Sequence, residues 1–539
     1  MGLQEGLRGF AVVTLLGMGS IAWADGADAR YPEGSATPRD LTAEEQRLIE
    51  TAPIVAARGG GAPTGPVTCP PEYAPCDGLL FAYEGSGSWL DIVDAMCAQV
   101  TTVGNAKAYV VVDTASEQTS AASFISAAGA NMANVEFIVR TTDTIWIRDY
   151  GPRFIYEGGV RAIVDHTYNR PRPNDNALSS YFGPLKNHEV YTIPLVHGGG
   201  NYHLSGTGDS FSTQLIANEN PSLSSAQIIT YWQDYQNLLT TITSAFPTSV
   251  DSTQHIDMWM IALSDTSFMI SDWPLASGST QDIICDGVAT DLANAGYTVV
   301  RVPAVNTGGT HYTFTNAVIC NDLVLMPTYT NATASAYNVT AHNTWAAALP
   351  SHTIVDIPCQ AIVTAAGVMH CIVMHVPENS GGVNPVAYLR TPNGGGSYNP
   401  SDSVSIVWTT DDDEAVSNVD IDLSVDGGAN WSPVAAGIPD TGSYNWIVPD
   451  VFATDARIRV TARDALGNMG ADLSDSGFAI NGAAPCPGDS NGDLVVDLAD
   501  ISEVLFNFGT PGPGGDVNGD NMVDLADLSE VLFNFGNAC

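Results

Sequence analysis

Between about residues 69 and 380, short apolar runs alternate with stretches of helical spacing. Five runs are predicted to be buried strands because they are continuous and apolar. Four stretches place apolar residues at helical spacing and begin with a serine, which is a favourable N-cap. This alternation predicts one large α/β domain. The predicted strands are Lys107–Asp113, Val135–Arg140, Val190–Leu195, Tyr297–Val302 and Val318–Pro327, and the predicted helices are Ser88–Val100, Ser224–Ala245, Ser279–Ala295 and Ser335–Leu349.

The pattern changes after residue 385. Up to about residue 482, short runs alternate between apolar and polar positions, turns separate them, and no stretch has good helical spacing. The runs Asp420–Val425 and Arg457–Ala462 alternate in this way, and Asp426-Gly427-Gly428 is typical of a β-hairpin turn. The pattern predicts an immunoglobulin-like β-sandwich over residues 385–482, and a fibronectin-like variant fits it equally well.

The last part of the chain is an internal repeat, with copies Gly488–Gly509 and Gly515–Gly536. In each copy, oxygen-bearing side chains stand at loop positions 1, 3, 5, 9 and 12, position 7 offers a backbone carbonyl, and an apolar helix follows. Such alternating oxygens can surround one Ca²⁺, so each copy predicts one calcium ion. The predicted ligands are Asp489, Asn491, Asp493, Val495, Asp497 and Asp500 in the first loop, and Asp516, Asn518, Asp520, Met522, Asp524 and Asp527 in the second.

These paired loops resemble a type I dockerin module, over residues 486–539. The resemblance implies an EF-hand-like fold with two bound calcium ions and a cohesin domain as protein partner. It implies nothing about catalysis. One departure is that glycine stands at loop position 4, as Gly492 and Gly519, instead of position 6.

Composition and the N-terminus indicate where the protein works. The chain has 18 basic and 59 acidic residues and a formal net charge of −41. Such a polyanion argues against nucleic acid as a partner and attracts Ca²⁺ and arginine-bearing substrates. An apolar stretch ending in Ala22-Trp23-Ala24 predicts a signal peptide over residues 1–24. We therefore expect a secreted protein, extracellular or attached to the cell surface, without a membrane span. Residues 25–68 are predicted to be a linker or pro-segment.

Export changes what the nine cysteines imply. An oxidising compartment favours disulfides, and the odd number leaves at least one thiol unpaired. Cys486 and Cys539 flank the C-terminal repeat and are predicted to join its ends. Cys371 is expected to be free, and the other six cysteines allow 15 connectivities, all of which stay open.

The chemistry is expected between residues 146 and 371. Gln254-His255-Ile256-Asp257 places an imidazole and a carboxylate two residues apart, which on a strand puts both on one face. Asp149 lies in the cluster Trp146–Pro152, and Cys371 follows a predicted glycine turn at Gly367. A free thiol with a histidine and two carboxylates predicts nucleophilic attack on an electrophilic carbon. Two carboxylates also suit a planar cation, which points to arginine-like substrates.

The strings WIRDYGP, HGGGN, HID, TNAVICND and GVMHC occur in this order and resemble the guanidine-modifying α/β-propeller (pentein) superfamily. The branch they resemble contains agmatine deiminases and bacterial, Porphyromonas-type peptidylarginine deiminases. The resemblance covers roughly residues 75–377 and implies a catalytic domain over residues 69–380. It also implies that the reaction needs no cofactor. A sandwich domain after the catalytic one also fits the secreted peptidylarginine deiminase. By motif it implies Cys371 as nucleophile, His255 as general acid and base, Asp149 and Asp257 as guanidinium ligands, Asn316 as an active-site asparagine, and Trp146 as a wall of the substrate channel.

One string separates the two branches. Asn169–Asp175 reads NRPRPND, and it resembles the loop with which the peptidylarginine branch holds the α-carboxylate of a C-terminal arginine. This role is implied for Arg170 and Arg172. The expected activity is hydrolysis of peptidyl, C-terminal arginine to citrulline and ammonia through a covalent thiouronium on the cysteine.

Two alternatives stay open. One is an agmatine deiminase that forms N-carbamoylputrescine for putrescine biosynthesis. The other is a surface scaffold that carries a catalytically decayed domain beside its dockerin. The natural protein substrate is not identified by the sequence.

Overall fold

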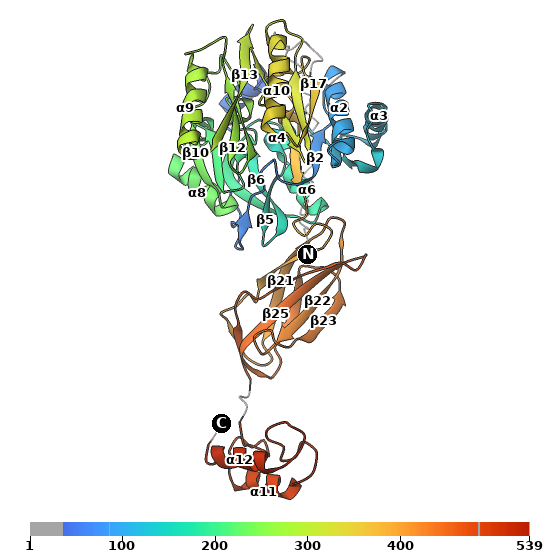
Figure 1. The fold of residues 1–539 in the computed structure, drawn as a ribbon, viewed down its shortest axis with the longest axis vertical. Helices are drawn as coiled ribbons and strands as arrows, with labels where there is room; N and C mark the ends of the chain where they lie inside the picture. The colour runs from blue at the N-terminus through green and yellow to red at the C-terminus, as the bar shows by residue number, and fades with distance from the viewer. Residues whose placement is uncertain (1–35, 86, 483–485, 538–539) are drawn as a thin grey trace, which may run out of the picture.

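The computed structural model describes residues 36–85, 87–482 and 486–537. Figure 1 shows three units in chain order: a large unit of sheets and helices, an all-β unit and a small helical unit. The predicted signal peptide, residues 1–24, lies outside the described residues. Within the described ranges, no helix is both long enough and apolar enough to cross a membrane.

Five sheets make up the large unit, and each repeats one arrangement. Its first strand pairs antiparallel with the second, and the second pairs parallel with the third. β18, the last strand, joins the sheet of β2, so the two ends of the unit close on each other. The sheets are β18 (Met374–Pro377), β2 (Cys76–Ala82), β3 (Lys107–Val112) and β4 (Val135–Val139); β1 (Val67–Thr68), β5 (Arg153–Glu157), β6 (Val160–Tyr168) and β7 (Glu189–His197); β8 (His203–Leu204), β9 (Asp209–Thr213) and β10 (Leu239–Thr243); β11 (Met260–Ser264), β12 (Ser267–Asp272), β13 (Thr298–Thr307) and β14 (Thr310–Thr313); β15 (Val318–Cys320), β16 (Leu323–Thr328) and β17 (Thr353–Pro358).

Helices provide the crossovers, because two parallel strands cannot be joined by a tight turn. One or two helices lie between the second and third strand of every sheet, and Figure 1 shows α2, α9 and α10 beside their sheets. The crossover helices are α2 (Ser88–Thr102), α5 (Pro173–Asn176) with α6 (Leu178–Leu185), α7 (Leu215–Glu219) with α8 (Ser225–Gln236), α9 (Thr280–Asn294) and α10 (Asn338–Ala348); α3 (Ala115–Ala127) joins β3 to β4.

The sequence pattern predicts most of these elements, and three predictions are wrong in part. The helix predicted over Ser224–Ala245 ends at Gln236, because Asn237 is left-handed and the β-branched run after it pairs with β9 as β10. The strand predicted over Val318–Pro327 is the hairpin of β15 and β16, since Asn321 turns the chain with a φ of 52°. The predicted cap Ser335 lies inside a 3₁₀ turn, and α10 begins three residues later.

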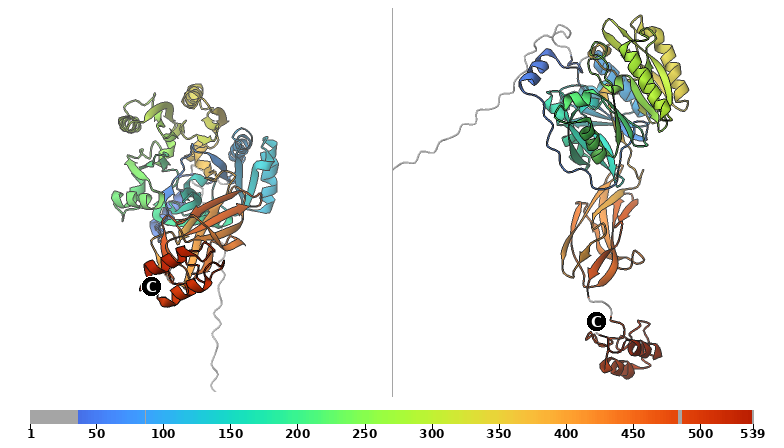
Figure 2. Two further views of the ribbon diagram at one scale, coloured as in Figure 1. Left: turned by 60° about the horizontal axis from the view of Figure 1, so that its bottom comes forward. Right: turned by 90° about the vertical axis from the view of Figure 1, so that its left-hand side faces the viewer.

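The N-terminal segment contains a helix that the sequence pattern does not predict. α1 (Ala43–Thr51) begins at Thr42, whose hydroxyl accepts from the Glu45 amide while the Glu45 carboxylate accepts from the Thr42 amide. No residue of α1 is buried. In the right-hand view of Figure 2 this dark-blue helix lies at the edge of the large unit. The contacts of Arg39 before α1 and of Glu45 within it, described below, therefore hold the helix in place.

Residues 386–481 form two packed sheets. The first contains β19 (Val386–Thr391), β21 (Ser403–Asp411) and β24 (Ser443–Ile447); the second contains β20 (Ser397–Tyr398), β27 (Phe478–Asn481), β25 (Phe452–Asp464), β22 (Val416–Ser424) and β23 (Ser432–Ile438), with β26 (Met469–Leu473) on β25. Their core contains Trp408 of the first sheet and Ile421 and Val460 of the second. The predicted hairpin joins β22 to β23. The immunoglobulin-like assignment stays a prediction. Arg161 of β6 binds Asp411 through two hydrogen bonds of 2.6 and 3.0 Å, which ties this unit to the first.

The C-terminal repeat folds as two loop–helix halves. α11 (Leu498–Asn507) and α12 (Leu525–Asn534) pack over a small core of Val496, Val504, Val523 and Val531. The halves exchange backbone hydrogen bonds, from Gly509 to Val523 and from Gly536 to Val496. Each half therefore completes the other, which fits the near-identity of the two sequences.

Among the described residues, seven cysteines are free thiols: Cys69, Cys76, Cys97, Cys285, Cys320, Cys359 and Cys371. The expectation of disulfides among the six other than Cys371 is wrong. These thiols are nearly all buried in the core, where they pack as small apolar side chains. Cys486 is disulfide-bonded, while its predicted partner Cys539 lies outside the described residues.

Candidate active site

The candidate site residues come from five places in the chain that the fold makes equivalent. Each lies in the short segment that enters the first strand of a sheet: Asp149 before β5, Gly200 before β8, Asp257 before β11, Asn316 before β15 and Cys371 before β18. Because the five sheets repeat one arrangement, these entry segments meet at the middle of the unit. Residues more than 200 positions apart are thereby placed within hydrogen-bond distance.

An arginine of the chain itself occupies this centre. The side chain of Arg39 is fully buried, and its guanidinium contacts four of the five residues predicted to be catalytic: Asp149, His255, Asp257 and Cys371. Nε and Nη2 donate to the two oxygens of Asp149 at 2.9 and 2.8 Å. Nη1 and Nη2 donate to the two oxygens of Asp257 at 3.2 and 3.0 Å. The planar cation is therefore held by two carboxylates, each through two hydrogen bonds.

The other two predicted groups lie on the same guanidinium. Cys371 Sγ is 2.6 Å from Nη1, and His255 Nδ1 is 2.7 Å from Nη2. His255 Nδ1 is also 3.4 Å from an oxygen of Asp149. Asn316 Oδ1 accepts from the Cys371 thiol at 3.3 Å, and its Nδ2 donates to the carbonyl of Asp257 at 3.1 Å. The nucleophile and the acid–base candidate thus contact two different nitrogens of one group.

Local structure around two of these residues differs from the prediction. His255 and Asp257 do not share a strand face: His255 is the extended residue before a 3₁₀ turn, Ile256–Met258, which contains Asp257. Their side chains converge because the turn brings them to the same guanidinium. Before Cys371, the left-handed residue is Ala366 and not Gly367. Position 367 has no room for a side chain, because a Cβ there would lie 2.7 Å from the Trp146 ring and 3.0 Å from Cys371 Sγ.

The charges in the site favour an ionised guanidinium. Burial opposes the charge of Arg39, but Asp149 and Asp257 outweigh it and raise its pKa. In turn Arg39 lowers the pKa of both carboxyl groups against the effect of their burial. Burial raises the pKa of the Cys371 thiol, the two carboxylates raise it further, and the Arg39 guanidinium lowers it. A bound guanidinium is therefore the group in this pocket that favours the reactive thiolate.

The string HGGGN provides the space for the guanidinium. A Cβ on Gly200 would lie 2.0 Å from Arg39 Nη2 and 2.8 Å from one oxygen of each carboxylate. A Cβ on Gly199 would meet the carbonyl of Arg148 at 2.3 Å, and one on Gly198 would meet His255 at 2.8 Å. The amides of this turn also bind Asp149: Gly199 N–H donates to its carbonyl and Gly200 N–H to its carboxylate. Glycine is needed here for close approach.

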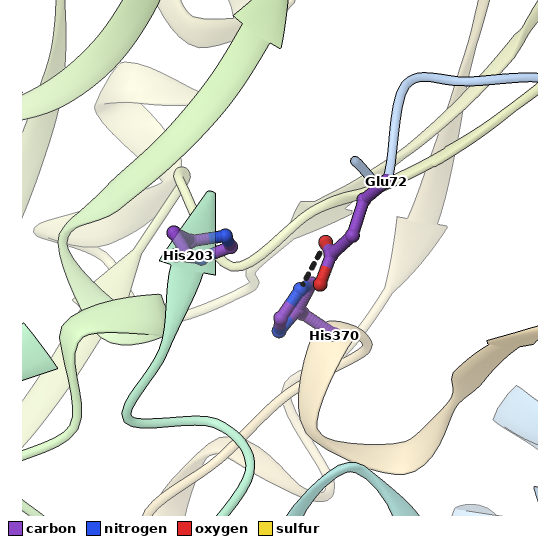
Figure 3. Close-up of side chains that lie close together, drawn as sticks. All are labelled: Glu72, His203 and His370. Carbon is purple, nitrogen blue, oxygen red and sulfur yellow. Dashed lines mark hydrogen bonds and ion pairs between the residues drawn. The ribbon is translucent and has the colours of Figure 1, made fainter. Parts of the chain in front are cut away.

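A second layer of side chains holds Asp257. His370 Nδ1 lies 3.0 Å from Asp257 Oδ2, and its Nε2 lies 2.7 Å from Glu72 (Figure 3). Glu72 also pairs with Arg148 at 2.7 Å, so Arg148 does not pair with its neighbour Asp149. His203 of β8 lies close to the His370 ring. His370 therefore orients Asp257, one of the two carboxylates on the guanidinium.

One ligand atom each of Glu72, His203 and His370 lies within 4.8 Å of the other two, so these residues are close enough to hold a metal ion. The charges argue against a cation there, because Arg148 already places a guanidinium on Glu72. We therefore assign these groups to support of Asp257.

The main chain on both sides of Arg39 is bound as well. Trp146 Nε1 donates to the carbonyl of Thr37 at 2.9 Å, and Arg39 N–H donates to the carbonyl of Ala365 at 3.0 Å. Arg170 Nε donates to the carbonyl of Arg39 at 3.2 Å. Arg172 Nη2 donates to the carbonyls of Pro38 and Asp40 at 2.8 and 3.3 Å. The three residues predicted to bind substrate thus line the route of a peptide backbone.

Arg172 also binds a carboxylate. Its Nε and Nη2 donate to the two oxygens of Glu45 at 2.7 and 3.3 Å, and Arg172 is buried. Burial raises the pKa of Glu45 but Arg172 lowers it by more, so the carboxylate is charged. A cavity of about 570 Å³ lies beside this segment and is lined in part by Ala36, Asp40, Asp251, Met258 and His311.

Three of the predicted calcium ligands lie close together in the first C-terminal loop. In the first loop, oxygens of Asp489, Asp493 and Asp500 lie within 4.8 Å of one another. Asp500 and Asp527 are buried, and each accepts backbone N–H groups of its own loop. Asp497 and Asp524 cap the two helices. The donor set is all oxygen, which fits a hard cation.

The ring of five sheets, with a thiol, an imidazole and two carboxylates on one guanidinium, defines an enzyme that modifies guanidinium groups. Residues 68–377 match the Porphyromonas-type peptidyl-arginine deiminase family, and the chain belongs to this family. It is therefore a deiminase, a hydrolase that acts on carbon–nitrogen bonds of a guanidino substrate.

Relatives with provisional agmatine deiminase names are similar over the same unit. A protein of Streptomyces avermitilis is 26% identical over 276 residues, which cover 46% of this chain and 78% of the relative. One of Yersinia pseudotuberculosis is 25% identical over 299 residues, which cover 48% and 81%. Among solved structures, the agmatine deiminase of Enterococcus faecalis has a TM-score of 0.51 at 16% identity, over 59% of this chain and all of that one. A structure named as an arginine deiminase from Porphyromonas gingivalis has a TM-score of 0.50 at 17% identity, over 58% and 99%. These structures share the fold.

Proposed function

We propose that this protein is a secreted protein-arginine deiminase that converts C-terminal arginine of peptides to citrulline and ammonia. The observation that carries the proposal is the bound state of Arg39, a peptidyl arginine whose guanidinium contacts the catalytic set and whose backbone contacts Arg170 and Arg172. Export is proposed from the N-terminal pattern.

The proposed reaction begins with the guanidinium between Asp149 and Asp257. Cys371 Sγ, as thiolate, forms a bond to the central carbon, since it already lies beside Nη1. His255 gives a proton to Nη2, which lies 2.7 Å away, and this nitrogen leaves as ammonia. The product of the first step is a thiouronium on Cys371. His255 then takes a proton from water, the oxygen adds to the carbon, and the sulfur leaves as citrulline forms.

Arg170 and Arg172 provide the preference for a chain end. The carbonyl of Arg39 accepts from Arg170, so one oxygen of a terminal carboxylate in the same position would do so too. Arg172 holds the Glu45 carboxylate through two hydrogen bonds, which supports its use for a carboxylate of the substrate. Agmatine has no carboxylate and gains nothing from either arginine.

We expect a peptide ending in arginine to be turned over faster than its C-terminal amide, a peptide with internal arginine, or agmatine. A charge-assisted contact is worth about 1.5–3 kcal/mol, or roughly 10- to 150-fold in kcat/KM. Replacing Arg170 and Arg172 by alanine should remove this advantage and leave agmatine turnover nearly unchanged. Release of citrulline and ammonia from the four substrates measures both effects.

Arg140 provides a matched control for that double variant. It lies near the same loop, donating to the carbonyl of Asn174, but in the described part of the chain no hydrogen bond joins it to residues 36–45. Arg140→Ala should keep the ranking of the four substrates. If the native protein prefers agmatine and the double variant slows all substrates alike, agmatine deiminase, which the names of the relatives favour, replaces the peptidylarginine proposal. A native protein inactive on all four would instead favour a surface scaffold.

We also propose that the C-terminal unit is a dockerin that binds two calcium ions and a cohesin partner. Calorimetric titration of the intact protein should show two sites. Asp493→Asn and Asp520→Asn should each weaken one of them roughly tenfold or more, because each removes charge from one loop. Asp322→Asn removes an exposed carboxylate outside the repeat and should leave both sites intact. Deimination should persist after chelation, since none of the assigned catalytic residues lies in these loops. A titration without calcium heat would contradict the proposal.

A further inference from the structure

The contacts of the N-terminal segment have the form of an enzyme–substrate complex. The residues that bind Arg39 are the residues that would bind and attack a guanidinium of a separate peptide. Its backbone is bound too, through carbonyls of Thr37, Pro38, Arg39 and Asp40. We infer that Arg39 is a substrate of its own active site, and that Cys371 converts it to citrulline and thereby opens the site. This inference rests on the proposed deiminase activity.

The contacts of Arg39 favour a side chain that reacts over one that only forms a stabilising salt bridge. A salt bridge that only stabilised the segment would need the two carboxylates and no more. Arg39 also has the nucleophile on one nitrogen and the histidine on another. It is fully buried, so bulk water does not screen these charges. The step consumes the Arg39 guanidinium and one water. A C–S bond forms and a C–N bond breaks to release ammonia, then a C–O bond forms and the C–S bond breaks.

Glu45 explains how an internal arginine can be used by a site that prefers a chain end. Arg39 has no terminal carboxylate, but the carboxylate of Glu45 is bound to Arg172 in its place. The capping box of α1 fixes Glu45 six residues after Arg39. Because the segment belongs to the same chain, its effective concentration is high, and weak recognition is enough.

Deimination would also release the segment. Citrulline is neutral, so it cannot neutralise Asp149 and Asp257, which are buried and lose their paired cation. α1 has no buried residue, and the contact that would remain to hold it is the Glu45–Arg172 ion pair. The cavity of about 570 Å³ beside Ala36 and Asp40 would then connect with the centre that the Arg39 side chain fills. The chain is therefore latent until one turnover on itself.

Mass spectrometry of the intact chain's N-terminal region tests the inference. The protein is cleaved at acidic residues, so that cleavage does not depend on arginine, and the peptide containing residue 39 is weighed. We expect citrulline at position 39 in the native protein and arginine in Cys371→Ala. Arg47, an exposed arginine of α1, is the internal control and should stay arginine in both.

Two further measurements separate the outcomes. When tagged Cys371→Ala is mixed with native protein, its Arg39 should stay arginine, because the side chain is buried in its own site. If Arg39 of the tagged variant is converted, the claim that the reaction takes place within one chain is wrong.

Arg39→Gln, which mimics the neutral product, should turn over an added C-terminal arginine peptide as fast as the converted native protein. A slower rate would contradict the claim that conversion of Arg39 releases the segment. If the native protein converts the added peptide but retains Arg39 as arginine, the inference fails and the proposed function stands. If it converts neither, both fail.

Discussion

Cys371→Ala is expected to abolish ammonia release from every guanidino substrate while the protein stays folded. The thiol lies 2.6 Å from a guanidinium nitrogen, and in the described residues no other cysteine contacts Arg39. Loss of a covalent nucleophile costs roughly 10⁴-fold or more in kcat. Steady-state ammonia release measures the loss, and circular dichroism with thermal unfolding reports on the fold.

Cys285→Ala is the matched control for that experiment. Cys285 is also a buried free thiol, and burial raises its pKa to about 12. It lies on α9, outside the entry segments that contain the site residues. Its replacement should leave kcat unchanged. Retained ammonia release in Cys371→Ala would remove the covalent mechanism.

Gly200→Ala is expected to lower the deiminase activity strongly, although it adds only a single methyl group. The new Cβ would lie 2.0 Å from the guanidinium nitrogen Nη2 and 2.8 Å from both carboxylates, so the cation cannot seat between them. A misplacement of about 1 Å at a reacting centre costs roughly 10²-fold, and we expect at least that loss in kcat/KM. Backbone strain is not the reason, because Gly200 does not have a positive φ.

Gly287→Ala separates this steric effect from a general effect of alanine. Gly287 lies inside α9, where an added Cβ meets no atom within 4 Å and alanine is the better helix former. This variant should keep full activity and equal or higher thermal stability. If Gly200→Ala binds substrate and releases ammonia at the native rate, the guanidinium position defined by Arg39 is not the one used in catalysis.

Local sequence determines much of the fold and the identity of the candidate site residues. Apolar runs and helical spacing predict β3, β4, β7, α2 and α9 closely, because both are local patterns that can be read from neighbouring residues. The calcium-type loops are visible because all predicted side-chain ligands of one ion lie within twelve residues. The deiminase strings are visible because each entry segment keeps its own short motif.

Tertiary structure alone decides what these segments do together. His255 and Asp257 converge through a 3₁₀ turn and not a strand face, and the cysteines expected to form disulfides are free thiols in the core. His370 and Glu72 gain a role only because Asp257 lies beside them.

Arg39 is the clearest case. It lies 110 residues from Asp149 and 332 from Cys371, in a segment whose sequence predicts only a linker or pro-segment. Nothing local distinguishes it from Arg47. Its position depends on the closure of five sheets around one centre, and on two buried carboxylates that need a cation there.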